Sequence, residues 1–161
     1  ITTVSAERIR EELQRILVHP ERARGFELLH QTGLLEHLWP QMEWSPERVD
    51  RTRAMLAALP GDVSFELALA AVMHDLEPKQ AGQICRAMTC TNRTRKCVLW
   101  LLEHRASLDE PDRLSLAQLK RLMACPWFDD LTHLVAARLA AGGQTLEPVR
   151  RIRERAAAIA H

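Results

Sequence analysis

The sequence predicts an all-α protein of roughly nine or ten short helices with no sheet. Three observations lead to this prediction. Apolar residues recur at helical spacing in nearly every segment, no stretch alternates like a half-buried strand, and helix-capping Ser, Thr and Asn residues separate the segments. With 161 residues, 47% of them hydrophobic, the chain can bury the core of one compact domain or two small ones.

Two helices are predicted between Ser5 and Gln41. The Ser5 hydroxyl can cap the first, and Pro20 ends it because the residue before a proline is pushed out of the α region. Pro20 also suits the first position of the second helix, which Gly33 ends in the left-handed conformation. The apolar faces are Ile9, Leu13, Ile16 and Leu17 in the first helix and Ala23, Phe26 and Leu29 in the second.

The middle of the chain predicts the core of the fold. A helix runs from Ser45 to about Leu59, where Pro60-Gly61 stops it. The stretch Phe65–Met73 is apolar on all sides, which indicates a central buried helix. A buried strand is the competing interpretation, but the richness in alanine favours a helix.

The remaining helices follow cap and proline signals. They are predicted to begin at Pro78, at Thr91 or Asn92, at Ser115, at Pro126 and near Thr145. The acidic loop from Leu108 to Arg113 is the candidate joint between subdomains. The sequence therefore predicts three segments, namely residues 1–44, residues 45–107 and residues 108–161.

The net charge is only +1, but the charges are unevenly distributed. Between Pro78 and Arg105 six cations accompany a single acid, and the candidate phosphate-binding residues there are Arg86, Arg93, Arg95 and Lys96. The last three lie at the start of a predicted helix, where exposed backbone N–H groups also attract phosphate. Arg150 and Arg151 of the last helix form a second candidate surface. An ordinary solvated basic face is the alternative in both places.

One stretch resembles a known family. Between Ser5 and Gln41 the chain reads SAERI-x-EEL-x-RIL, then P-x-RA-x-G-x-x-LL, then TGLLEHLWPQ. This pattern is similar to a segment of bacterial tRNA nucleotidyltransferases and poly(A) polymerases that follows the catalytic head and neck and opens the RNA-binding body. The likeness is looser over Phe65–Arg105 and too faint to use after Leu108.

The resemblance implies an RNA-binding region that serves tRNA processing or RNA tailing. Its expected partners are tRNA or another RNA, held through the phosphate backbone, and the chain's own N-terminal catalytic head. Magnesium and a nucleoside triphosphate are expected in that head, and no cofactor in this part. The start at Ile1 rather than Met favours a piece of a longer protein. Arg22 and Arg24, which lie inside the resembling stretch, are expected to be freer than Arg8.

His74-Asp75 is the strongest argument for an alternative function, because HD-type metal phosphohydrolases use an adjacent His and Asp as ligands. His37 upstream and Asp109 or Asp112 downstream could complete a site, but the residues after Asp75 lack the further His that such sites show. The competing interpretation is a degenerate HD-like motif in which His74 ends the buried helix. We therefore predict no metal ligands.

Other chemistry is not visible in the sequence. Asp129 and Asp130 diverge by about 100° on a helix and cannot clamp one metal, and no glycine-rich phosphate loop occurs, so this part is expected not to be catalytic itself. The four cysteines form no C-x-x-C pair and predict free thiols in a reducing cytoplasm. No apolar run approaches the roughly 20 residues of a membrane span, so no membrane is expected as a partner.

The four tryptophans are not interleaved with the basic clusters, which makes recognition by base stacking weak. Trp39 and Trp44 are expected to seal the first segment, while Trp100 and Trp127 are expected at the edge of the core. A helical module that binds protein remains the third functional alternative.

Overall fold

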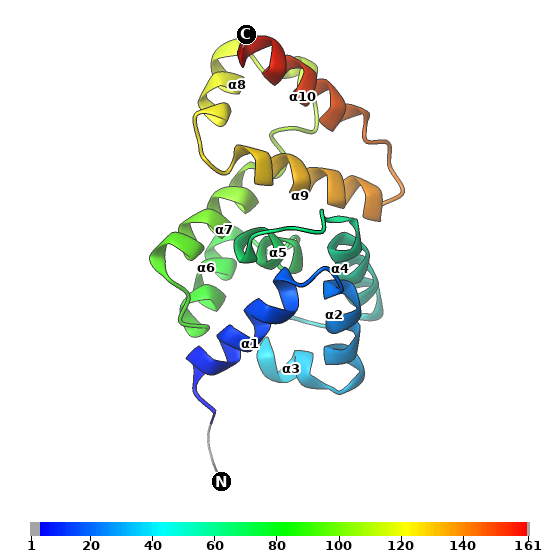
Figure 1. Ribbon diagram of the computed structural model, residues 1–161, viewed down its shortest axis with the longest axis vertical. Coiled ribbons are helices and arrows are strands. Elements are labelled where there is room, and N and C mark those ends of the chain that lie inside the picture. Colours follow the sequence, from blue (N-terminus) through cyan, green and yellow to red (C-terminus); the bar gives the residue numbers. More distant parts are fainter. Residues whose placement is uncertain (1–3, 161) are drawn as a thin grey trace.

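A computed structural model describes residues 4–160, which form ten α-helices, one 3₁₀ helix (η1) and no strand (Figure 1). The all-α prediction is therefore confirmed over this range. The helices are α1 (Ala6–Val18), α2 (Arg22–Gln31), α3 (Leu34–Leu38), α4 (Pro46–Ala58), α5 (Phe65–Val72), α6 (Pro78–Ala87), α7 (Asn92–His104), η1 (Pro111–Arg113), α8 (Leu116–Met123), α9 (Phe128–Ala141) and α10 (Glu147–Ala160).

The predicted hydroxyl caps account for the starts of α1, α4, α7 and α8. A hydroxyl accepts a hydrogen bond from the backbone N–H three residues later at Ser5, Ser45, Thr91 and Ser115. At Thr145, near the start of α10, the hydroxyl accepts from the Glu147 N–H, two residues later. Ser115 also forms a capping box with Gln118. Gly33 adopts φ 74° between α2 and α3, as its left-handed assignment requires.

Two helix starts were predicted wrongly by two residues. The second helix begins at Arg22 instead of Pro20, because the Glu21 N–H donates to His19 Nδ1 at 3.0 Å and so belongs to the turn. The helix expected from Pro126 begins at Phe128, with the Phe128 N–H donating to the Cys125 carbonyl. In both places proline opens the turn that leads into the helix.

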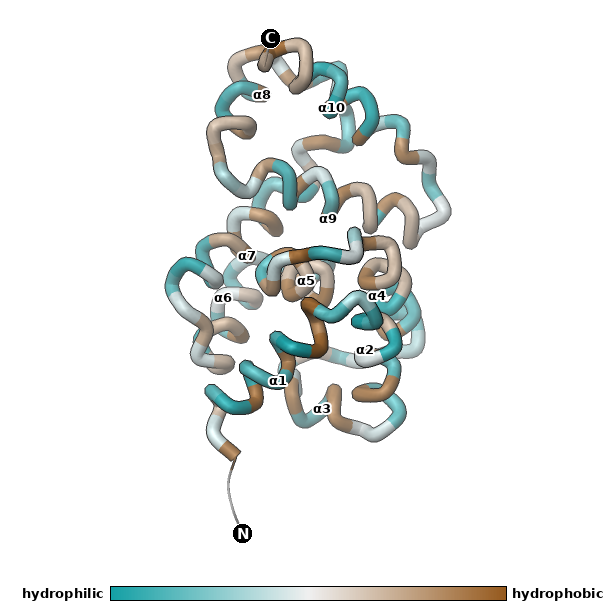
Figure 2. The backbone as a smooth tube through the Cα atoms, viewed as in Figure 1, coloured by the Kyte–Doolittle hydropathy of each residue, from teal (hydrophilic) through white to brown (hydrophobic). Residues whose placement is uncertain are grey.

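Helix α5 lies at the centre of the fold, as predicted for Phe65–Met73. Seven of its eight residues are buried, and it contacts α1, α4, α7 and α9. Figure 2 shows the hydrophobic colouring of α5 among these neighbours. A helix that is apolar on every side needs neighbours on every side, which is the arrangement found.

The hydrophobic core continues across the expected joint at Leu108. Helix α9 packs on α4, α5 and α7, and buried residues from both sides of Leu108 belong to one cluster. Arg138 of α9 donates to the Arg105 carbonyl at 2.9 Å and pairs with Asp109. Helices α8 and α10 lie beyond α9 with η1, at the end of the molecule opposite α1 and α3 (Figure 1).

The tryptophans of the first segment pack as expected. Trp39 is fully buried, and its ring centroid lies 5.9 Å from that of Trp44, which in turn lies 5.7 Å from Phe26. Trp39 Nε1 donates to Met88 Sδ at 3.4 Å, so this cluster also reaches α6. None of the helices between residues 4 and 160 is long and apolar enough to cross a bilayer.

Candidate nucleic-acid interface

The first turn of α7 is held by a relay of three side chains. Thr91 Oγ1 accepts from the Thr94 N–H, and the Thr91 hydroxyl donates to Thr94 Oγ1, both at 3.1 Å. The Thr94 hydroxyl donates to Glu66 Oε1 in the first turn of α5 at 2.8 Å. The first backbone N–H groups of α7 have no carbonyl partner within the helix. The relay therefore fixes the position of a helix end whose dipole favours anions.

The turn between α6 and α7 is also fixed from outside. Thr89 adopts φ 56°, which is uncommon for a residue other than glycine, while the Cys90 N–H donates to the Cys85 carbonyl at 3.0 Å. Arg10 of α1 donates through Nη1 to the Thr89 carbonyl at 2.5 Å. Helix α1 thus fastens the turn. No local pattern could have indicated this contact, because the two residues lie 79 positions apart.

The four basic residues predicted in this region lie at the end of α6 and the start of α7, two helices that pack against each other. We call them the basic corner: Arg86, Arg93, Arg95 and Lys96. All but Arg95 are exposed, and Arg95 Nη2 donates to Asn92 Oδ1 at 3.3 Å. None of the ion pairs found among residues 4–160 involves a member of the basic corner.

The arginines predicted on the last helix have carboxylate partners. Arg150 pairs with Glu147 and with Glu154 Oε1, the latter at 2.6 Å. Its contact with Glu147 raises the pKa of Arg150 and lowers the pKa of Glu147. Arg151 Nη1 lies 2.9 Å from Asp112 Oδ2. A phosphate at this surface would have to compete with carboxylates, whereas at the basic corner it would not.

Arg22 is not the free surface cation that the sequence suggested. It is 2% exposed, and its guanidinium donates to three backbone carbonyls. Nε bonds to Leu17 at 2.8 Å, Nη1 to Pro60 at 3.0 Å and Nη2 to Gly61 at 2.7 Å. The planar fork of five N–H donors suits this use, since it can reach carbonyls from two chain segments at once. Arg22 therefore joins α1 to the loop after α4. Arg24, in contrast, is exposed, but it is not free either, because its Nη1 pairs with Glu27 Oε2 at 3.2 Å.

The His74-Asp75 pair is held in structural contacts. His74 is 9% exposed, its Nδ1 lies 2.9 Å from the Ala71 carbonyl, and burial lowers its pKa. Asp75 Oδ2 accepts from Arg48 Nε at 3.0 Å and from Arg48 Nη2 at 2.8 Å. Across residues 4–160 no three His, Cys, Asp or Glu side chains converge in a way that could hold a metal ion. The phosphohydrolase alternative thus gains no ligand set from this part of the chain.

The fold and the basic corner define a helical protein with a cationic surface for which no ion pair is found among residues 4–160. The family model described as the probable RNA- and SrmB-binding site of polymerase A matches residues 1–45. The resemblance stated for Ser5–Gln41 is therefore confirmed, and the match supports RNA binding in a protein of the polymerase type. The looser likeness over Phe65–Arg105 stays a prediction. No curated protein matches the chain.

Proposed function

We propose that this chain is the RNA-binding region of a template-independent nucleotidyltransferase that extends RNA 3′ ends in the cytoplasm, and that it holds tRNA or a similar RNA through phosphates at the basic corner. The catalytic head, with its magnesium ions and nucleoside triphosphate, would be a separate part of the same protein. In this proposal the present chain binds the RNA so that the RNA 3′ end can reach the catalytic head.

One observation carries the proposal. Arg10, which lies within the segment matched by the RNA-binding family, donates directly to the Thr89 carbonyl in the turn of the basic corner. The matched segment thereby positions three exposed cations for which no ion pair is found among residues 4–160: Arg86, Arg93 and Lys96. Charged side chains beside exposed helix N–H groups are a favourable phosphate site. The absence of disulfides among the four cysteines suits a reducing compartment.

The test is binding of the chain to an unmodified tRNA transcript across a salt series. Arg93→Gln/Lys96→Gln removes two cations from the basic corner, and Arg150→Gln/Arg151→Gln removes two from α10 as a matched control. If the basic corner contacts two phosphates, the first variant should reduce the slope of log affinity against log salt by about 1.4–1.8. The second should change it less, because its cations are already paired. Equal slopes in the two variants would overturn the assignment to the basic corner.

Protein binding is the second candidate, because the family description names the protein SrmB beside RNA. A mainly apolar groove of about 450 Å³ lies in the matched segment, lined in part by the exposed side chains Val4, Ile9 and Leu34. Leu34→Asp should abolish binding of purified SrmB while leaving the tRNA salt slope unchanged. Retained SrmB binding in that variant would exclude the groove as the protein site.

A further inference from the structure

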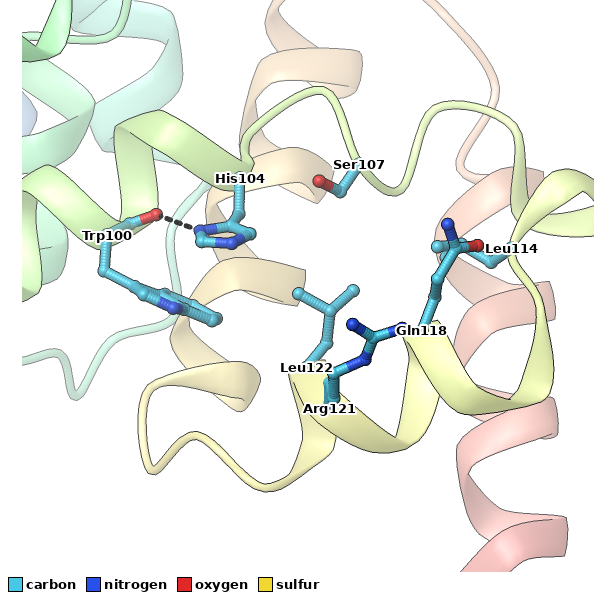
Figure 3. Close-up of a pocket in the computed structure, with 7 residues that line it drawn as sticks. All are labelled: Trp100, His104, Ser107, Leu114, Gln118, Arg121 and Leu122. Carbon is cyan, nitrogen blue, oxygen red and sulfur yellow. Dashed lines mark hydrogen bonds between the residues drawn. The ribbon is translucent and has the colours of Figure 1, made fainter.

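A pocket of about 280 Å³ lies between the end of α7 and helix α8, next to the loop that joins them (Figure 3). One wall is aromatic, formed by Trp100 and His104. The other sides carry Ser107, Gln118 and Arg121, and Leu122 forms part of the floor. Ligand pockets are typically about 300–1,000 Å³, so this one can take a single small ring system.

The aromatic wall is a preassembled pair of rings stacked on each other, which leaves only the outer faces and the edges of the pair for a ligand. The ring centroids of Trp100 and His104 lie 4.5 Å apart with planes inclined by 29°, and Trp127 supports the indole from 6.2 Å. His104 Nδ1 lies 2.8 Å from the Trp100 carbonyl. Since a carbonyl only accepts hydrogen bonds, Nδ1 must carry a proton, and Nε2 is left for a ligand. Trp100 and His104 are both half-buried, so part of each ring remains accessible.

The polar side offers mainly donors. Arg121 uses only Nε, in a long 3.4 Å contact with the Ala117 carbonyl, which leaves its Nη groups without a partner among residues 4–160. Gln118 Oε1 accepts from the Ser115 N–H at 2.8 Å, so its amide NH₂ is available. The lining contains no acidic residue. An aromatic wall opposite such donors suits a flat, electron-rich ring that carries carbonyl or ring-nitrogen acceptors, which describes a nucleobase.

The pocket continues the surface of the basic corner. Lys96 and Trp100 are four residues apart in α7, as are Trp100 and His104, so the three lie on one face of the helix. The rise between successive members is about 6 Å. A strand whose phosphate contacts Lys96 can therefore place a neighbouring base against Trp100. The sequence did not reveal this arrangement, because Arg121 and Trp100 line one pocket only after α7 and α8 have packed.

We infer that this pocket binds one unpaired nucleobase of the RNA, packed against the stacked Trp100–His104 pair and hydrogen-bonded by Arg121. The inference rests on the proposed function, since the phosphates of the same strand would lie on the basic corner. It predicts a preference for RNA with unpaired nucleotides over a blunt duplex, because a base inside a duplex cannot enter the pocket.

The test compares the affinity of the chain for a short single-stranded RNA with its affinity for a blunt duplex of the same sequence. Trp100→Leu should weaken single-strand binding about fivefold or more, whereas Trp100→Phe should retain most of it. Arg121→Gln should also weaken single-strand binding. Lys120→Gln is the matched control, because Lys120 is the neighbouring residue on α8 and lies outside the pocket lining, and it should weaken single-strand binding less. Duplex affinity should change little in all four variants.

Arg121 is exposed, so its variant remains informative even if Trp100→Leu fails to fold. If Arg121→Gln weakens single-strand binding no more than Lys120→Gln does, or if Trp100→Leu folds and binds single strands as the unmodified chain does, the pocket is only a packing feature and the inference is overturned. The proposed function would stand in that case, provided that Arg93→Gln/Lys96→Gln still lowers the salt slope. If the unmodified chain binds neither RNA, both proposals are overturned.

Discussion

The Thr94 hydroxyl donates a hydrogen bond to Glu66 Oε1 at 2.8 Å, which ties the first turn of α7 to the first turn of the buried helix α5. Thr94 is only 8% exposed, so few waters can replace this contact. Thr94 lies between Arg93 and Lys96 in the chain, and its contact with Glu66 links these exposed cations to the core. The position of the basic corner therefore depends on a neutral residue that would not touch RNA.

Thr94→Val is expected to lower the free energy of unfolding by about 1–2 kcal/mol, because it removes the hydroxyl and leaves the Glu66 carboxylate without its donor. Thr52→Val is the matched control. Thr52 is fully buried and its Oγ1 has no hydrogen-bond partner among the described residues, so the same substitution should be neutral or stabilising. Urea denaturation measures the free energy of unfolding of both variants, and equal losses of stability would contradict the assigned role of Thr94.

Arg22→Met is expected to destabilise the fold by about 3–5 kcal/mol, because one buried and two part-buried carbonyl contacts lose their donor at once. Arg22→Lys should rescue only part of this loss, since an ammonium group cannot reproduce the planar fork. Arg24→Ala, on the exposed side of α2, should stay within about 0.5 kcal/mol of the unmodified chain. Urea denaturation of the three variants checks this order of stabilities. A small loss of stability in Arg22→Met would show that the carbonyls are satisfied by other donors.

Gly25→Ala is expected to destabilise the protein by about 1 kcal/mol or more, because an added Cβ would lie 2.7 Å from Ile16 Cγ2 at the contact of α1 and α2. Gly82→Ala is a helical control in which the new Cβ meets Leu99 at an ordinary 3.6 Å, so it should stabilise by about 0.5–1 kcal/mol. Combining Gly25→Ala with Ile16→Ala should give a favourable interaction energy in a double-mutant cycle. Strictly additive changes in the free energy of unfolding would show that Ile16 is not the residue that clashes with the new Cβ.

Stability should fall as the pH drops through about 6.5, because burial lowers the pKa of His74 in the folded state and the unfolded chain then binds the extra proton. Asp75 opposes this shift, and Arg51 and Arg48 add to it. The loss begins near the unfolded pKa and ends below the lowered folded pKa. Urea denaturation at about pH 7.5 and about pH 5.5 should therefore show a smaller decrease in His74→Gln than in the unmodified chain. Identical decreases would contradict the prediction.

Alkylation should distinguish the cysteines. Contact with the Cys85 thiol, together with the charge of Arg10, lowers the pKa of Cys90 against the opposing effect of burial. The same contact and burial raise the pKa of Cys85, and burial raises the pKa of Cys97 to about 12. Because the thiolate is the reactive form, iodoacetamide should label Cys90 before Cys85 and before Cys97. Peptide mapping by mass spectrometry checks the order, and faster labelling of Cys97 would contradict it.

The features that the sequence predicted are local. The capping hydroxyls of Ser5, Ser45 and Thr91 act within three residues, and the all-apolar Phe65–Met73 could only be satisfied at the centre of the fold. Together with the proline at the start of α6, these signals placed the residues of the basic corner on the two correct helices, α6 and α7.

The features that the sequence missed depend on distant partners. Arg22 looks like a surface cation until the carbonyls of Pro60 and Gly61, 38 and 39 residues away, are brought to it. The contact of Arg10 with Thr89 and the approach of Arg121 to Trp100 likewise arise only when helices pack. Side chains alone do not reveal such partners, because a backbone carbonyl is available at every position of the chain.

The contact of Arg10 with Thr89 has a consequence for dissecting this protein into modules. The family match ends at residue 45, yet Arg10 and the Trp39 indole both have their partners just after α6, at Thr89 and Met88. An excised peptide of residues 1–45 would expose the buried faces of α1 and α2 and lose the turn that Arg10 fastens. The unit recognised by sequence similarity is thus smaller than the unit that can fold, and we expect the excised peptide to be unable to bind RNA although it carries the recognised signature.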